Sequence, residues 1–140
     1  MEQLRRTHND AKRLLMRSVA CKDNYVLDVG CGRGGDVHKW KSIGVNLYGV
    51  DPDPESIKEA NIRAQKIGLP AEYKVGDIHN APDIEFDVVC YNFSLQYTFG
   101  SLSLFESSIR EISKRLKRDG FLIGVVPDAD KILKLPCDWS

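Results

Sequence analysis

Apolar segments of strand length alternate along this 140-residue chain with segments whose apolar residues recur at helical spacing. Strands are predicted at residues 25–30, 45–51, 71–77, 86–94 and 121–127. Helices are predicted within 1–22 and at 34–43, 51–68 and 101–117, with another beginning at 128–135. This alternation predicts an α/β fold, with a mostly parallel sheet of about five strands and helices on both faces. We expect one domain over 1–140, made of an N-terminal helix (1–22), a core (23–127) and a C-terminal tail (128–140).

Two of the predicted helices have a clear apolar face. The first is predicted to bury Leu4, Ala11, Leu14, Leu15 and Val19. The helix at 101–117 is predicted to bury Leu102, Phe105, Ile109, Ile112 and Leu116. Both helices are therefore expected to pack against the sheet.

Composition excludes several classes of protein. Apolar residues make up 42% and charged residues 29% of the chain, which is typical of a globular protein. Lys+Arg and Asp+Glu both number 20, which argues against a strongly basic nucleic-acid coat but not against a local basic groove. The 4 cysteines have neither zinc-ligand nor disulfide-framework spacing, so a reducing compartment and no metal are expected. No apolar run reaches the roughly 20 residues of a membrane span.

A glycine-rich loop follows the first predicted strand. Gly30, Gly32 and Gly35 match the spacing G-x-G-x-x-G, and a helix is predicted directly behind them. Glycine lets a ligand approach the backbone, and a helix N-terminus offers free N–H groups. The motif alone is weak evidence, because a tight strand-to-helix turn without any ligand has the same appearance.

Acidic residues at three successive strand ends add to this motif. Asp51 lies about 20 residues beyond the loop, where an acid can bind a ribose hydroxyl pair. Asp77 can accept a hydrogen bond from an adenine amino group, although capping or turn roles would also explain these two acids. Asp28, two residues before Gly30, would repel a pyrophosphate but attract the cationic methionyl end of S-adenosylmethionine. These acids favour a nucleoside ligand, and S-adenosylmethionine over an NAD-like dinucleotide.

The stretch "VLDVGCGRGGD" is similar to the first motif of class I S-adenosylmethionine-dependent methyltransferases. With the following "VHKW" it resembles the variant found in mRNA cap guanine-N7 methyltransferases. Four further segments resemble that family in matching order: "THNDAKRLLM", "DPDPESIKEANIRAQ", "NFSLQYTFGS" and "FLIGVVPDADKIL". The resemblance covers nearly the whole chain. It implies a Rossmann-like class I methyltransferase fold that lacks the terminal strands.

The motifs and the resemblance together assign residues to two sides of one pocket. The cofactor side is expected to contain Lys12, Asp28, Gly30, Gly32, Asp51, Asp77, Asn92 and Tyr97. The cap side is expected to contain His8, Asn9, Arg33, Lys39, Arg63 and Gln96. By resemblance, Lys12 pairs with the methionyl carboxylate, and the three cap-side cations face the cap phosphates. Asn92 stands where the family has glutamine, and Gln96 where it has histidine.

The implied activity is methyl transfer from S-adenosylmethionine to guanine N7 of the GpppN end of capped RNA. N7 has a free lone pair at neutral pH, so no general base, nucleophile or metal is required, and catalysis rests on positioning and electrostatics. The alternatives are a methyltransferase with another substrate and a non-catalytic cofactor-binding module. The family implies the nucleus, or the host cytoplasm for a viral protein.

The sequence stops soon after the fifth predicted strand, whereas class I methyltransferases normally continue with two more. Three explanations compete: an excised fragment, one piece of a split enzyme completed by a protein partner, or a reduced protein that recognises its substrate differently.

Overall fold

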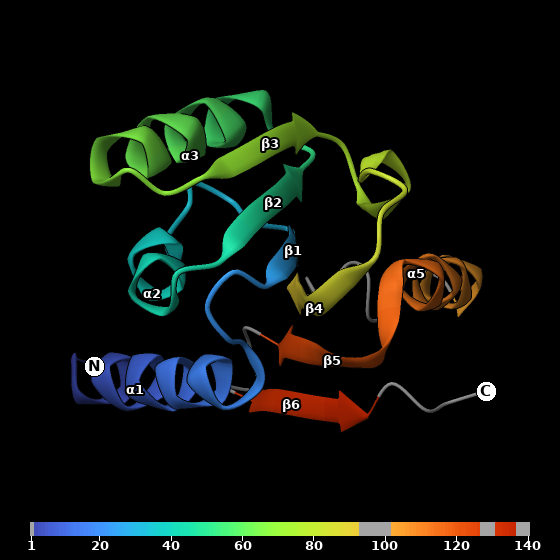
Figure 1. The fold of residues 1–140 in the computed structure, drawn as a ribbon, viewed down its shortest axis with the longest axis horizontal. Coiled ribbons are helices and arrows are strands. Elements are labelled where there is room, and N and C mark those ends of the chain that lie inside the picture. The colour runs from blue at the N-terminus through green and yellow to red at the C-terminus, as the bar shows by residue number, and fades with distance from the viewer. Residues whose placement is uncertain (1, 93–101, 127–130, 137–140) are drawn as a thin grey trace.

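The computed structural model describes residues 2–92, 102–126 and 131–136 (Figure 1). The helices are α1 (Glu2–Val19), α2 (Val37–Ile43), α3 (Pro54–Ile67) and α5 (Leu102–Arg115), with a short 3₁₀ helix η1 (Ile78–Asn80). The strands are β1 (Tyr25–Val29), β2 (Asn46–Asp51), β3 (Ala71–Val75), β4 (Phe86–Asn92), β5 (Leu116–Val126) and β6 (Lys131–Pro136). All five predicted strands and the helices expected between them are therefore present.

The strands form one sheet in the order β3-β2-β1-β4-β5-β6. The first five are parallel, and β6 pairs antiparallel with β5. The strand order reverses between β1 and β4, which are neighbours in the sheet. Ligands of such sheets bind outside the carboxyl ends of the strands at this reversal, so the glycine loop after β1 lies at the expected place.

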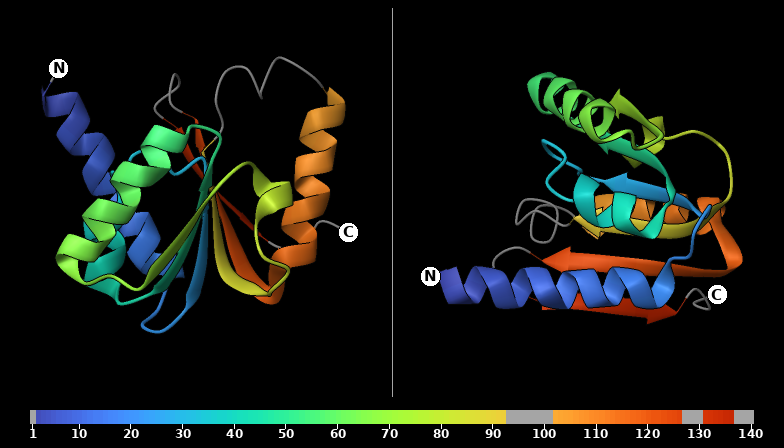
Figure 2. Two further views of the ribbon diagram at one scale, coloured as in Figure 1. Left: turned by 90° about the horizontal axis from the view of Figure 1, so that it is seen from above. Right: turned by 60° about the vertical axis from the view of Figure 1, so that its left-hand side comes forward.

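Helices cover both faces of the sheet, as predicted, with α1, α2 and α3 on one face and η1 and α5 on the other (Figure 2). The core on the first face is centred on the fully buried Trp40 and Met16. The core on the second face includes Ile78, Phe86 and Ile112, against which Ile109 and Leu116 pack. In the described part of the chain, no helix is long and apolar enough to cross a bilayer.

The prediction of a helix beginning in 128–135 is wrong for the residues that the structure describes there. Residues 131–136 form strand β6, which pairs along β5 from Val126 opposite Lys131 to Phe121 opposite Pro136. The edge of β5 would otherwise present unpaired N–H and C=O groups, and β6 satisfies them. This pairing depends on a neighbouring strand, so the local sequence did not indicate it.

The buried face of α1 also differs from the prediction. Val19 is buried as expected, but Ala11 is exposed and Leu14 is 71% exposed. The side chains that face the sheet instead include Lys12 and Met16, which are 8% and 0% exposed. A lysine is accommodated in the buried face because its ammonium group binds the carboxylate of Asp36, directly before α2.

Candidate functional site

The glycine loop is held across the sheet by backbone hydrogen bonds. The N–H groups of Gly30 and Cys31 donate to the carbonyl oxygen of Val50, at 2.8 and 3.1 Å. Gly30 has a φ of 75°, and a Cβ there would lie 3.1 Å from the carbonyl oxygen of Asn92 at the end of β4. The loop therefore needs glycine where it passes between β2 and β4.

The third glycine of the predicted motif is not the one that the backbone requires. Gly34 has a φ of 81°, and a Cβ there would lie 3.1 Å from the Cα of Ala60 on α3. Gly35 has no positive φ, and a Cβ there would meet no atom within 4 Å. The turn before α2 passes close to α3 at Gly34, and the motif does not encode this contact.

We expect Gly34→Ala to lower the free energy of unfolding by about 1–3 kcal/mol, because it adds both backbone strain and a contact with Ala60. Gly35→Ala is the matched control and is expected to change stability by less than about 0.5 kcal/mol. Urea denaturation followed by circular dichroism measures both. Equal losses in the two variants would contradict the assignment.

Asp51 braces the loop from the end of β2. Its Oδ2 accepts a hydrogen bond from the Gly32 N–H at 2.9 Å, and its Oδ1 accepts one from the Asp53 N–H at 2.9 Å. The helix cap of α3 is Asp53, whose carboxylate accepts hydrogen bonds from the Glu55 N–H and the Ser56 hydroxyl. Asp53, and not Asp51, therefore caps α3. The Asp51 carboxylate instead lies beside the glycine loop.

Asp28 lies at the bottom of the site and is 4% exposed. The side-chain amide of Asn92 donates to the Asp28 Oδ1 at 2.8 Å and to the Val29 carbonyl oxygen at 2.9 Å. Burial, and next the negative charge of Asp36, raise the pKa of Asp28 from 3.8 to about 7. Asn92, predicted on the cofactor side, thus acts in this structure by holding Asp28.

A cluster of buried charges joins α1 to α2. The ammonium groups of Lys12 and Lys39 both bind the carboxylate of Asp36, and the Lys39 Nζ lies 3.0 Å from its Oδ1. Burial would lower the pKa of Lys12, but the charge and hydrogen bond of Asp36, together with the charges of Cys90 and Asp28, outweigh burial and raise that pKa. The structure thus brings together Lys12, predicted on the cofactor side, and Lys39, predicted on the cap side.

The sequence analysis missed Asp36. Its position directly before α2 is typical of a helix cap, yet its side chain makes no capping hydrogen bond. The carboxylate turns instead toward the two lysines. Only Lys39, on the first turn of α2, is near Asp36 in the sequence, because Lys12 lies 24 residues earlier.

The other two predicted cap-side cations form a separate, more exposed group. Arg33 Nε lies 3.5 Å from Glu59 Oε2, and Arg63 donates to Glu59 Oε1 at 2.8 Å. Their side chains are 69% and 44% exposed. Glu59 holds both guanidinium groups on one surface of α3, and the sequence analysis did not identify it.

The remaining predicted residues fall in three places. Asp77 caps η1 and receives a hydrogen bond from the His79 N–H at 2.8 Å. The turn role considered for this residue is therefore present. His8 and Asn9 lie in the first half of α1, and the structure does not describe their side chains. Gln96 and Tyr97 lie outside the described residues.

Two cavities lie away from these residues. One, of about 320 Å³, is lined by Tyr48, Glu72, Lys74 and Asn80 among others. The other, of about 490 Å³, lies at the amino ends of the strands beside Asn24. Neither is lined by a predicted site residue. No cluster of three potential metal ligands occurs among residues 2–92, 102–126 and 131–136.

Solved structures of other proteins share this arrangement of strands and helices. The PH0226 protein from Pyrococcus horikoshii is 26% identical, with a TM-score of 0.70, over 89% of this chain and 58% of that one. An S-adenosylmethionine-dependent methyltransferase from Clostridium acetobutylicum is 20% identical, with a TM-score of 0.67, over 81% of this chain and 46% of that one. The second likeness concerns the fold alone. The predicted Rossmann-like fold of class I methyltransferases is confirmed.

Sequence comparison extends over almost the whole chain. The mRNA cap guanine-N(7) methyltransferase of Schizosaccharomyces pombe is 33% identical over 147 residues, covering 94% of this chain and 41% of that protein. The enzyme of the same name from Cryptococcus neoformans is 31% identical, covering 95% of this chain and 21% of that protein. The chain thus spans less than half the length of these relatives. A family model, described as the mRNA (guanine-N(7))-methyltransferase domain, matches residues 1–138, so the chain belongs to this family.

Proposed function

We propose that this chain binds S-adenosylmethionine and directs its methyl group to guanine N7 of the mRNA 5′ cap. One observation carries the proposal: an acidic residue lies at or near the carboxyl end of each of three adjacent parallel strands. These three ends surround a loop whose glycines have positive φ angles. Asp28 belongs to β1, Asp51 to β2, and Asp77 follows β3. The family match supplies the cap as substrate.

The residues of the site fit the proposed cofactor. The buried carboxylate of Asp28 suits the cationic methionyl end, because burial strengthens its attraction to a positive charge. The Asp51 carboxylate suits the ribose hydroxyl groups and the Asp77 carboxylate suits the adenine amino group. The Lys12 ammonium suits the methionyl carboxylate, for which it would exchange part of its contact with Asp36.

The cationic side chains of the cap side fit a triphosphate. Arg33 and Arg63 converge on Glu59, so their guanidinium groups are already held on one surface. Such forked donors match phosphate oxygens. Lys39 is buried beside Asp36 rather than beside the two arginines, and its assignment to the cap phosphates stays a prediction.

The chemistry requires little of the protein beyond placement. S-adenosylmethionine supplies a methyl group on a positively charged sulfur. Guanine N7 carries no proton at neutral pH and attacks with its free lone pair, so no side chain has to accept a proton. The residues of this chain hold the cofactor methyl group in line with guanine N7. This alignment is the expected source of the rate enhancement.

The proposal also covers the cellular location and the binding partners of the protein. The relatives come from fungi and plants, which supports mRNA processing in the nucleus; the host cytoplasm applies to a viral source. Capped RNA is the proposed macromolecular substrate. We also predict that a protein partner, or further residues, completes the part of the site that binds the cap guanine.

Methyl transfer from labelled S-adenosylmethionine to capped RNA tests the proposed activity, with the same RNA ending in an uncapped triphosphate as control. We expect label on the capped RNA alone, recovered as 7-methylguanosine after digestion. Label at another position would identify a methyltransferase with a different substrate. Calorimetric binding of the cofactor without any transfer would indicate a cofactor-binding module.

Arg33→Glu is expected to weaken binding of the cap dinucleotide GpppG by about 10-fold to 100-fold, because it replaces a phosphate-facing cation by an anion beside Glu59. Binding of S-adenosylhomocysteine should change by less than about 2-fold. Arg110→Glu, a charge reversal at another exposed arginine, on α5, is the matched control. Equal losses for both ligands in Arg33→Glu would contradict a cap-side role.

A further inference from the structure

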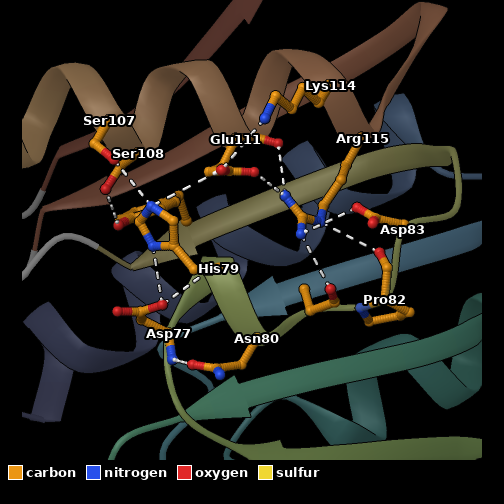
Figure 3. A network of polar contacts seen from close by, with 12 residues as sticks. Asp77, His79, Asn80, Pro82, Asp83, Ser107, Ser108, Glu111, Lys114 and Arg115 are labelled. Carbon is orange, nitrogen blue, oxygen red and sulfur yellow. Dashed lines mark hydrogen bonds and ion pairs between the residues drawn. The ribbon is translucent and has the colours of Figure 1, made fainter.

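His79 is in direct contact with the acid that follows β3. Its backbone N–H and its ring Nδ1 both lie within hydrogen-bond distance of Asp77 Oδ1, at 2.8 and 3.1 Å (Figure 3). Both contacts fall on the same oxygen. The Asp77 carboxylate also accepts a hydrogen bond from the Asn80 N–H, in the capping box at the start of η1. His79 thus fixes Oδ1, and Oδ2, a carboxylate oxygen with two lone pairs, can accept a hydrogen bond from a further donor.

The opposite edge of the His79 ring contacts α5. Its Nε2 lies 2.9 Å from the hydroxyl oxygen of Ser107 and 3.9 Å from Glu111 Oε1. An ionised carboxylate only accepts hydrogen bonds, so Nδ1 carries the proton toward Asp77. In the neutral ring Nε2 then accepts from the Ser107 hydroxyl. One tautomer satisfies both contacts, so the ring has a defined orientation.

The surroundings of His79 hold it against α5. Ile78, directly before it, is fully buried in the core. Arg115 is 4% exposed and donates to the carbonyl oxygens of Ala81 and Pro82, at 3.1 and 3.2 Å. The segment that follows η1 is therefore tied to the end of α5, and Figure 3 shows both attachments side by side. A ring that is anchored in this way can hold a carboxylate at a fixed angle.

We propose that His79 is a positioning residue that turns Asp77 Oδ2 toward the adenine amino group of the cofactor and thereby selects adenine over other purines. This inference rests on the proposed function, which places adenine beside Asp77. An adenine amino group donates a hydrogen bond to Oδ2, whereas the carbonyl oxygen of hypoxanthine at the same place repels it. The fixed orientation of Asp77 prevents the carboxylate from turning away from the wrong base.

The test compares S-adenosylhomocysteine with its inosine counterpart by calorimetry. The unaltered protein is expected to prefer the adenine ligand by about 100-fold. His79→Phe removes both ring nitrogens, and we expect it to weaken the adenine ligand by about 10-fold without weakening the inosine ligand, because the freed carboxylate can turn away from the inosine carbonyl oxygen. His79→Asn retains a donor close to the position of Nδ1 and should recover most of the preference. Lys114→Ala, on α5, where the lysine pairs with Glu111 rather than with Asp77, is the control.

The ratio of the two affinities decides between positioning and a merely structural role. His79 is 42% exposed, so both substitutions are expected to leave the melting temperature nearly unchanged. If His79→Phe weakens both ligands equally, or leaves the ratio unchanged, the positioning role is wrong while the proposed cofactor stands. If the unaltered protein binds neither ligand, the proposed function itself fails and this inference fails with it.

Discussion

Asp36→Asn is expected to lower the free energy of unfolding by about 3 kcal/mol at neutral pH, because it leaves two buried ammonium groups without a carboxylate. The side chains of Lys12, Lys39 and Asp36 are only 10%, 9% and 16% exposed. Water therefore compensates little for the lost partner. The asparagine amide still accepts a hydrogen bond, but it carries no charge to offset the two cations.

The pH dependence of this loss follows from the pKa of Asp36. Burial would raise that pKa, but the charges and hydrogen bonds of Lys12 and Lys39 together outweigh burial and hold the pKa below 3.8. A carboxyl group whose pKa falls on folding stabilises the folded state above its unfolded pKa, and this contribution is lost as the pH falls through the folded pKa. Urea denaturation should therefore show the full loss at pH 7 and a shrinking loss below about pH 4.

Lys39→Met is the matched control for Asp36→Asn. It leaves one lysine with one aspartate and fills the same space with an apolar side chain, so we expect a loss of less than about 1.5 kcal/mol. In the double variant, one of the two ammonium groups that Asp36 binds is also gone. The two effects should then fall short of additivity by about 1 kcal/mol or more. Additive losses would show that Lys39 and Asp36 do not interact energetically.

The sequence predicted the parts of the site that depend on neighbours along the chain. Asp51 and the glycines of the loop occupy positions fixed by the ends of β2 and β1, and those ends follow from short apolar runs. Asp36 could not be assigned in this way. Its partner Lys12 lies 24 residues earlier, and only the packing of α1 against α2 brings the two together.

The same distinction explains the errors in the fold. Strand β6 forms because β5 offers an open edge, which is a property of the assembled sheet rather than of residues 131–136. Leu14 is exposed because Lys12 and Met16, on another side of the helix, face the core. Helical spacing permits either face to be buried. The face that is buried carries Met16 and Val19 together with Lys12.

Asp28→Asn is expected to stabilise the protein at alkaline pH, in contrast to Asp36→Asn. An aspartate whose pKa rises from 3.8 to about 7 on folding costs the folded state on the order of 4 kcal/mol above that pH. The folded state then binds the proton more tightly than the unfolded state, so stability is greatest at low pH and declines as the pH rises from about 4 to 7. Asparagine removes this dependence and can still accept the hydrogen bond from Asn92.

The measurement is the free energy of unfolding of both proteins in urea at pH 5, 6, 7 and 8. The advantage of Asp28→Asn should grow with pH up to about 7 and then remain constant. A constant advantage over the whole range would mean that Asp28 does not titrate there. An advantage that falls as the pH rises would contradict the upward direction of its pKa.

With S-adenosylmethionine bound, Asp28→Asn should destabilise the protein instead of stabilising it, because the positive methionyl end favours the ionised form of Asp28. Binding of S-adenosylmethionine near pH 6.5 should then release a proton, which calorimetry in two buffers of different ionisation enthalpy detects. Asp28→Asn should abolish the release and weaken binding by about 100-fold. Asp28→Asn and Asp36→Asn each remove one negative charge from the same buried cluster. At pH 8 and without cofactor, Asp28→Asn should nevertheless stabilise the protein and Asp36→Asn should destabilise it. Equal shifts in both would show that net charge, rather than the partner of each carboxylate, governs this site.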